Sequence, residues 1–251
     1  MALTLSLARS LGCFALLVAS FVPALSAAEQ PGREDRSTYE IRRPHTIAEA
    51  EFGVIALPNA PISAGRRGGD TPIIGKIGNG DATLLIGMHL LYRGDPRWMI
   101  GASALFGPSP TTDTGYGGRS DLERTHARNY FWIGGEARYY PLRVRLFEGY
   151  VGASVGGVVV ADRYSNASGE TAPPIYGEKS VTVRSEGFSA GLLAGLRWNF
   201  AHSWGVGFSL RVDQWILPTQ QACTPVGDCS TLSGGVLALG GGLVIGYRIP
   251  L

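Results

Sequence analysis

The chain has 251 residues, of which 17% are charged and 36 are glycine, and its formal net charge is +2. This small charge, without any basic stripe, argues against a nucleic-acid-binding protein. Only two lysines occur, Lys76 and Lys179, whereas a soluble domain of this size normally covers its surface with lysine and glutamate.

The N-terminal residues have the pattern of an export signal. Arg9 gives a short positive region, residues 11–22 are apolar, and the small residues up to Ala28 provide a cleavage site. An apolar stretch of about 12 residues is too short for a spanning helix, which needs about 20. We therefore predict a cleaved signal peptide over residues 1–28 and a flexible periplasmic tail over the polar residues 29–45.

After this tail, apolar and polar residues alternate in eight segments bounded by Gly, Pro, Asn and Asp. One parity carries Leu, Val, Ile, Phe or Ala, and the other carries mainly Gly, Ser and a few charges. The expected strands are residues 46–57, 82–93, 97–107, 126–140, 147–162, 186–200, 203–215 and 235–251. The connections alternate long and short, as in outer-membrane barrels with long external loops and short periplasmic turns. The fold predicted for residues 46–251 is all-β, an eight-stranded antiparallel up-and-down transmembrane β-barrel.

Large aromatic rings gather at the ends of these segments, mainly beside the short connections and on the apolar parity. A soluble sheet buries such rings mid-strand, whereas a barrel in a bilayer places them outward at the water–lipid boundary. Alternation alone also fits a soluble lipocalin-like barrel, but the Gly- and Ser-rich polar parity suits a narrow, crowded interior better than a solvated exterior. The predicted periplasmic girdle consists of Tyr92, Trp98, Tyr139, Phe147, Trp198, Phe200, Trp204 and Tyr247.

The polar parity of an eight-stranded barrel faces an interior that is only wide enough for side chains. Opposite charges must pair there, because a lone charge in a low-dielectric interior is costly. We therefore expect structural salt bridges that plug the lumen, and an ion pathway is the alternative, although a conducting porin needs about 16 strands. The predicted lumen charge network consists of Glu49, Glu51, Glu136, Arg138, Glu148, Arg197, Arg211, Asp213 and Arg248.

Two cysteines, Cys223 and Cys229, remain once the signal is removed. Exported chains enter a compartment that permits disulfides, and the short spacer with Pro225 and Gly227 can bring the two residues within bonding range. We predict a disulfide that closes a small loop tip, with a free, reduced pair as the alternative. Neither a third cysteine nor a histidine is close in sequence, so we expect no metal and no cofactor.

The run from Gly134 to Pro141, followed by Tyr150-Val151-Gly152-Ala153, resembles the small outer-membrane β-barrel family, which includes the OmpA-like and OmpW-like eight-stranded barrels. The C-terminal run is similar to the terminal-strand signal read by the barrel assembly machinery. It departs from that pattern because its last residue is leucine where the family usually ends in phenylalanine. The residues that match the signal are Tyr247, Ile249 and Leu251.

This resemblance specifies fold and location better than activity, since members include adhesins, anchors, small channels and enzymes. A deacylase needs a serine, a histidine and a carboxylate, and no His-x-Ser pair lies on one strand face. An acyltransferase could use Ser120, Asp121 and His126, a trio that any loop-rich chain offers. We expect no enzymatic activity.

The expected function is that of a structural or surface-interaction protein of the bacterial outer membrane. The alternatives are a narrow channel for small or apolar solutes and an enzyme that modifies lipid A. The expected partners are outer-membrane lipids, lipopolysaccharide near Arg66, Arg67 and Lys76, the barrel assembly machinery, and an extracellular ligand of the long loops, but not nucleic acid.

Overall fold

The computed structural model describes residues 44–58, 60, 81–109, 124–166, 180–224 and 229–250. The predicted signal peptide, nearly all of the predicted tail, Leu251, Arg66, Arg67, Lys76, Ser120 and Asp121 lie outside these residues. The strands are β1 (His45–Ala56), β2 (Ala82–Asp95), β3 (Trp98–Ser109), β4 (Arg124–Val144), β5 (Phe147–Asn166), β6 (Ser180–Trp198), β7 (Trp204–Ile216) and β8 (Gly235–Pro250).

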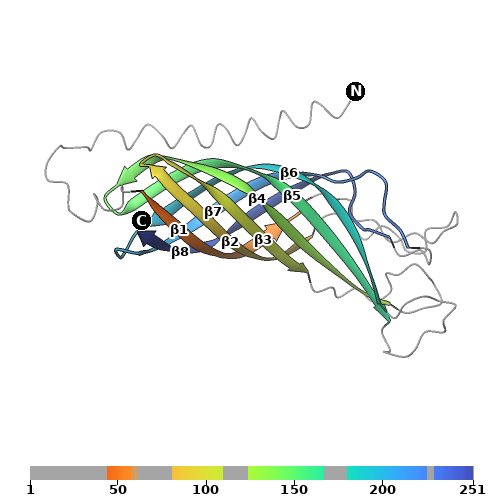
Figure 1. The fold of residues 1–251 in the computed structure, drawn as a ribbon. Helices are drawn as coiled ribbons and strands as arrows, with labels where there is room; N and C mark the ends of the chain where they lie inside the picture. The colour runs from red at the N-terminus through yellow and green to blue at the C-terminus, as the bar shows by residue number, and fades with distance from the viewer. Residues whose placement is uncertain are drawn as a thin grey trace, which may run out of the picture. The chain divides into compact units, whose positions relative to one another are not determined.

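The strands form one closed barrel in which each pairs with its sequence neighbours in antiparallel register (Figure 1). The last strand, β8, pairs with β1 and closes the ring, for example with Glu49 opposite Gly246. Closure satisfies the backbone groups of the two edges that an open sheet would leave unpaired. The predicted fold class is therefore confirmed.

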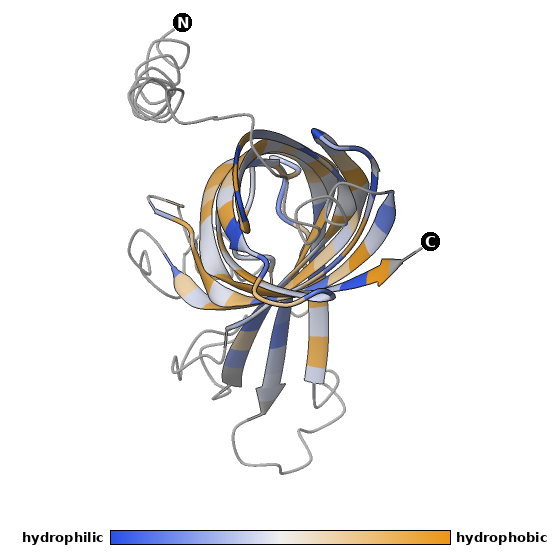
Figure 2. Cartoon of the chain, turned by 90° about the vertical axis from the view of Figure 1, so that its left-hand side faces the viewer, coloured by the Kyte–Doolittle hydropathy of each residue, from blue (hydrophilic) through white to orange (hydrophobic). Residues whose placement is uncertain are grey.

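The outer wall of the barrel is apolar, and hydrophobic and hydrophilic residues alternate along its strands (Figure 2). Alternate side chains on every strand point outward, and many of them are large and exposed, such as Leu84, Leu243 and Met88, the last with 71% of its surface accessible. An apolar surface that runs around the whole ring is far larger than the patches soluble monomers expose, and it is stable only against hydrocarbon. Among the described residues, no helix is long and apolar enough to cross a membrane.

Aromatic rings stand at both ends of this wall. At the end with the short turns, which we call the short-turn end, Trp98 packs on Tyr139 with ring centroids 4.9 Å apart, and Trp204 packs on Tyr247 at 5.0 Å. Seven of the eight rings predicted for the girdle are exposed, and Tyr139 is half-buried. At the opposite, long-loop end, the exposed rings are Phe106, Phe131 and Phe188. The wall thus has aromatic residues at both of its boundaries, as a bilayer requires.

Three strand boundaries differ from expectation, at the end of β4, the end of β5 and the start of β6. Pro141 was expected to end its strand, but β4 continues through it to Val144. The pairing of β4 with β5 shifts register between Tyr139 and Leu142, so the proline, which has no backbone N–H, sits at a β-bulge where it is tolerated. In addition, β5 and β6 continue beyond the predicted ends, pairing as far as Ser165 with Ser180, so the hairpin extends further at the long-loop end (Figure 1).

Candidate functional site

The candidate site is the interior of the barrel, which is filled with side chains arranged in layers. Along β1 from the short-turn end, the inward residues are His45, Ile47, Glu49, Glu51 and then, after Gly53, Ile55. β2 repeats this order, from Arg93 through Leu91 and His89 to Leu85, and the remaining strands contribute side chains to some of these layers. Because the layers on neighbouring strands coincide, charges meet charges and apolar side chains meet apolar side chains across the lumen.

The charged layer, which we call the central belt, is organised around Glu49. This carboxylate accepts a hydrogen bond from Arg138 Nη1 at 2.7 Å through Oε2 and one from Arg197 Nη1 at 2.8 Å through Oε1. All three side chains are nearly inaccessible to solvent, and they come from β1, β4 and β6. One carboxylate therefore holds two arginines across the barrel, and both depend on it for charge compensation.

A second part of the central belt surrounds His89 of β2. Its Nε2 lies 3.1 Å from Glu51 Oε2, and its Nδ1 lies 2.9 Å from Ser103 Oγ and 3.4 Å from Glu136 Oε2. Glu136 also forms an ion pair with Arg138 at 2.6 Å, which joins the two parts of the belt. The histidine thus bridges two carboxylates that would otherwise repel each other.

The third part of the belt lies on β5 and β7. Arg211 forms an ion pair with Asp213 at 2.9 Å, and Asp213 accepts a hydrogen bond from Ser154 at 3.1 Å. The Arg211 guanidinium also lies 5.0 Å from the centre of the Trp132 ring, in a cation–π arrangement. This stack forms the boundary between the belt and the apolar layer at the long-loop end.

Inward glycines provide the space that these long side chains occupy. A Cβ added at Gly246 would lie 2.8 Å from Arg197 Nη2 and 3.1 Å from Glu49 Cγ, and one at Gly240 would lie 2.7 Å from Arg211 Cγ. Larger residues at these positions would collide with the belt. The abundant glycine of the polar parity is therefore a packing requirement of a charge-filled interior.

We expect Gly246→Val to destabilise the barrel by about 1–3 kcal/mol, because the added methyl groups would push Arg197 and Glu49 apart. Urea-dependent unfolding in lipid vesicles measures this change. Gly241→Val is the matched control, since Gly241 faces outward and its nearest neighbour, at 3.0 Å, is the tip of the Leu210 side chain. Equal losses in the two variants would show that strand propensity, and not the crowded lumen, sets the cost.

The mouth at the short-turn end has its own polar cluster. Arg93 pairs with Glu148 at 2.9 Å and lies 4.2 Å from the centre of the Tyr140 ring. Asn199 donates a hydrogen bond to Glu148 and accepts one from Arg248, at 3.1 and 3.3 Å. Of the predicted lumen residues, Glu148 and Arg248 therefore belong to this mouth and not to the central belt.

A different polar cluster lies at the long-loop end. Asp162 accepts hydrogen bonds from His126 Nε2 at 2.8 Å and from Arg128 Nε at 3.3 Å. Arg128 also pairs with Asp81 at 3.1 Å, and the Tyr130 hydroxyl donates to the same Asp81 carboxylate. His126 is buried and bonded to a carboxylate within the barrel, whereas Ser120 and Asp121, the other two members of the possible acyltransferase trio, lie outside the described residues.

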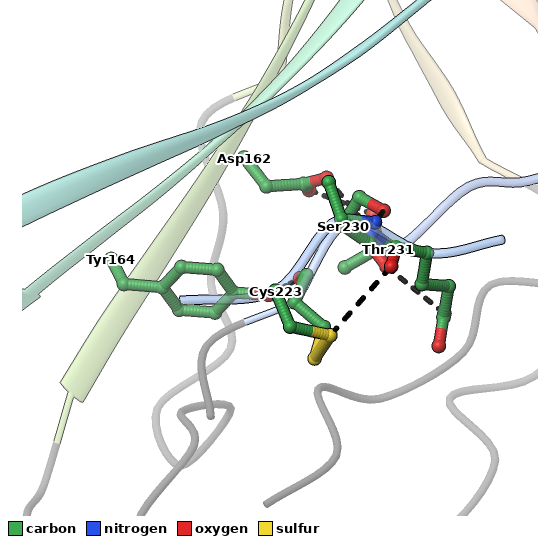
Figure 3. The surroundings of a disulfide bond; sticks show 8 residues. Asp162, Tyr164, Cys223, Ser230 and Thr231 are labelled. Atoms are coloured by element: carbon green, nitrogen blue, oxygen red, sulfur yellow. Dashed lines mark hydrogen bonds between the residues drawn. A yellow bond between two sulfur atoms is a disulfide. The ribbon is translucent and has the colours of Figure 1, made fainter. Parts of the chain in front are cut away.

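The predicted disulfide between Cys223 and Cys229 is present, and its setting differs from the expected loop tip (Figure 3). Cys223 is exposed, whereas Cys229 is completely buried, together with the Ser230 that follows it. The Tyr164 hydroxyl donates a hydrogen bond to the Cys229 carbonyl at 2.6 Å. The described residues from Cys229 to Leu232 therefore lie in the long-loop mouth, where they find hydrogen-bond partners on the barrel wall.

The central belt shows which contacts escaped sequence reasoning. All nine predicted lumen charges are buried and face inward. His89, Arg93, Arg128 and Asp162 were not predicted as members of any network, and His89 lies among three partners. The inward parity of these residues was visible, but their partners lie on strands distant in sequence.

A cavity of about 10 Å³ lies beside Glu49, Arg138 and Arg197, which is close to the smallest volume that holds one water molecule. Among the described residues, no group of three His, Cys, Asp or Glu side chains could hold a metal ion. The arrangement is suited to holding the barrel closed and rigid.

An apolar wall with aromatic borders, around an interior that the described side chains occupy, defines a membrane-spanning β-barrel. No protein-family model matches the chain, and no curated protein matches its sequence. Among solved structures, the fold is similar to that of Neisserial surface protein A, with a TM-score of 0.51 and 10% identity over 82% of this chain and 97% of that one.

Two further structures are similar with lower scores. The attachment invasion locus protein Ail of Yersinia pestis has a TM-score of 0.45 and 12% identity over 83% of this chain and 99% of that one. A major outer membrane protein from Thermus thermophilus has a TM-score of 0.47 and 15% identity over 80% of this chain and 99% of that one. The similarity to Neisserial surface protein A shows that the chain shares the barrel fold of that protein, in agreement with the fold that the sequence predicted.

Proposed function

We propose that the chain is a non-enzymatic barrel of a bacterial outer membrane, with a structural or surface-interaction role. Its short-turn end faces the periplasm and its long-loop end faces outward, following the general rule for such barrels. The apolar wall and its aromatic borders support the membrane location. The predicted signal peptide would direct export, and Tyr247 and Ile249, both outward on β8, would contribute to recognition by the assembly machinery.

The observation that carries the proposal is the central belt. Its four carboxylates, Glu49, Glu51, Glu136 and Asp213, are matched by three arginines and His89, and each contacts at least one cation or hydroxyl within the belt. An open pathway would need these side chains to separate and become hydrated. Leaving a buried charge without its partner is costly, so a closed lumen is the stable state.

Single-channel recording of the purified barrel in planar bilayers tests this function. We expect no steady conductance, because paired side chains fill the lumen. Steady, reproducible pores would contradict the closed lumen and favour the narrow channel.

The absence of catalysis is tested separately by mass spectrometry of lipid A from cells with and without the protein. We expect identical lipid A profiles. A change in acylation that depends on the protein would contradict the non-enzymatic proposal, and the buried pair of His126 and Asp162 would then be the first residues to replace.

A further inference from the structure

Charged side chains are rare on the outward face of the barrel wall in its long-loop half. Among the described side chains of the strands in this half, the outward charges are Arg163 of β5 and Arg184 and Glu186 of β6. All three are exposed, whereas neighbouring residues of opposite parity, such as Asp162, are buried in the lumen. We call Arg163 and Arg184 the arginine pair, which forms a localised positive site on an otherwise apolar wall.

The strand register makes the two arginines neighbours. Arg163 lies opposite Thr182 of β6, and Arg184 lies opposite Ala161 of β5, so the arginine pair occupies diagonal positions on one face. Diagonal neighbours in an antiparallel sheet are about 7–8 Å apart, and long side chains can reach one shared group across this distance. No hydrogen bond or ion pair joins either arginine to another described residue. Two unpaired like charges repel each other, so an anion bound between them is favourable.

The arginine pair stands at the height of lipid headgroups. Phe131 and Glu186 both lie opposite Val159 of β5, which places this row at the aromatic border. Arg184 is two residues beyond Glu186, and Arg163 is four residues beyond Val159. At about 3.3 Å per residue and a tilt of about 40°, the two arginines lie about 5 and 10 Å above the border. The headgroup region on each side of a bilayer is about 5–8 Å thick, so both side chains reach it.

A notch in the apolar wall lies below the arginine pair, on the same strand as Arg163. Gly157 of β5 lies between Ile133 of β4 and Phe188 of β6. These two side chains point outward with 57% and 52% of their surfaces exposed. Among the described residues, the nearest atom that a Cβ added at Gly157 would meet is the Gly187 carbonyl oxygen at 3.9 Å. A glycine between two projecting side chains leaves room for an acyl chain along β5.

We propose that the arginine pair and the notch bind one lipid that carries a phosphate monoester, namely lipid A of the outer leaflet. A phosphate monoester bears close to two negative charges at neutral pH and so matches two arginines, whereas the phosphodiester of a glycerophospholipid bears only one. Guanidinium groups bind phosphate oxygens through charge-assisted hydrogen bonds. Because the long-loop end is proposed to face outward, the pair lies in the leaflet that contains lipid A, and the site rests on that proposed orientation. It is distinct from the contact expected at Arg66, Arg67 and Lys76, which lie outside the described residues.

Native mass spectrometry of the full-length protein in detergent micelles tests this site, because it counts the lipids bound to each protein molecule. The probes are lipid A with its phosphates, dephosphorylated lipid A and phosphatidylglycerol, each titrated over the same concentrations. We expect lipid A to bind at least about tenfold more tightly than either of the other probes. Replacing both Arg163→Gln and Arg184→Gln should reduce the affinity for lipid A at least about tenfold, because each arginine at an anionic lipid surface contributes about fivefold.

The matched control combines Arg97→Gln with Arg145→Gln, because it removes the same two charges from exposed positions near the short-turn end. Its affinity for lipid A should equal that of the wild-type protein. Equal losses in the two double variants, or equal binding of phosphatidylglycerol and lipid A, would mean that net charge alone attracts the lipid and would overturn the proposal. Unchanged lipid A binding after replacement of the arginine pair would overturn it as well.

Gly157→Leu tests the notch while leaving the arginine pair in place. We expect the affinity for lipid A to fall at least about fourfold, which is the contribution of one displaced CH2 group. Ala48→Leu, which adds the same side chain at an exposed outward position of β1, should have no effect. Unchanged binding in Gly157→Leu would contradict the seating of the acyl chain. None of these variants alters the lumen, so a failure of this proposal leaves the single-channel result unchanged and is distinguishable from a failure of the proposed function.

Discussion

Replacing Glu49 with glutamine is expected to lower the free energy of unfolding of the barrel by about 3–5 kcal/mol. The substitution keeps the shape of the side chain but removes the charge that Arg138 and Arg197 share. Both guanidinium groups would then remain buried without full compensation. Urea titration of folding in lipid vesicles, followed by tryptophan fluorescence, measures the loss.

The control for this prediction is Glu186→Gln. Glu186 is an exposed, outward carboxylate of β6, and exposed charges contribute only about 0–1 kcal/mol. A loss in Glu49→Gln as small as in the control would mean that water or other side chains already compensate the two arginines. The central belt would then not be the feature that closes the lumen.

The second large effect is expected for Met88→Arg, which places a charge on the outer wall. Met88 is 71% exposed and lies in the middle of β2, between outward Ile86 and Leu90. An arginine at the bilayer midplane costs about 2–4 kcal/mol, whereas near the interfaces the cost falls to about 0–1 kcal/mol. The same urea titration in lipid vesicles reports the difference.

Thr182→Arg serves as the position-matched comparison, since Thr182 is also outward and exposed but lies beyond the last aromatic residue of β6, Phe188. We expect little or no loss from it. If Met88→Arg were equally neutral, the wall would be in contact with water and the interpretation as a membrane barrel would be wrong. The experiment thus tests the inside–outside assignment directly.

Much of the interior could be anticipated because strand geometry has a period of two residues. Once a strand is recognised, every second side chain must share a face, so the inward position of Glu49, Glu136 and Arg211 followed from parity alone. The positions of Trp98 and Trp204 at the boundary followed in the same way from their distance to the short turns. These features depend on local sequence only.

The partners of the inward residues could not be anticipated, because they depend on how the closed barrel staggers its strands. Arg138 reaches Glu49 across 89 positions of sequence, and Arg197 reaches the same carboxylate across 148. A change of two residues in register would keep every parity and exchange every partner. For this reason the bridge that His89 forms between Glu51 and Glu136 could not be predicted.

The sequence by itself determined the number of strands, the apolar wall, its aromatic borders and the pair of cysteines, because each is encoded in a short window. Only the tertiary structure decided that Pro141 lies at a bulge within β4, that Asp162 accepts hydrogen bonds from Thr231, and that Leu232 is buried at the long-loop end. The connection between β7 and β8 has no periodicity in its sequence, so no local rule places its described residues inside or outside the barrel. These residues fold inward because their carbonyl and amide groups find hydrogen-bond partners on the barrel wall, and Leu232 finds apolar contacts there. The wall exists only once the ring of strands is closed.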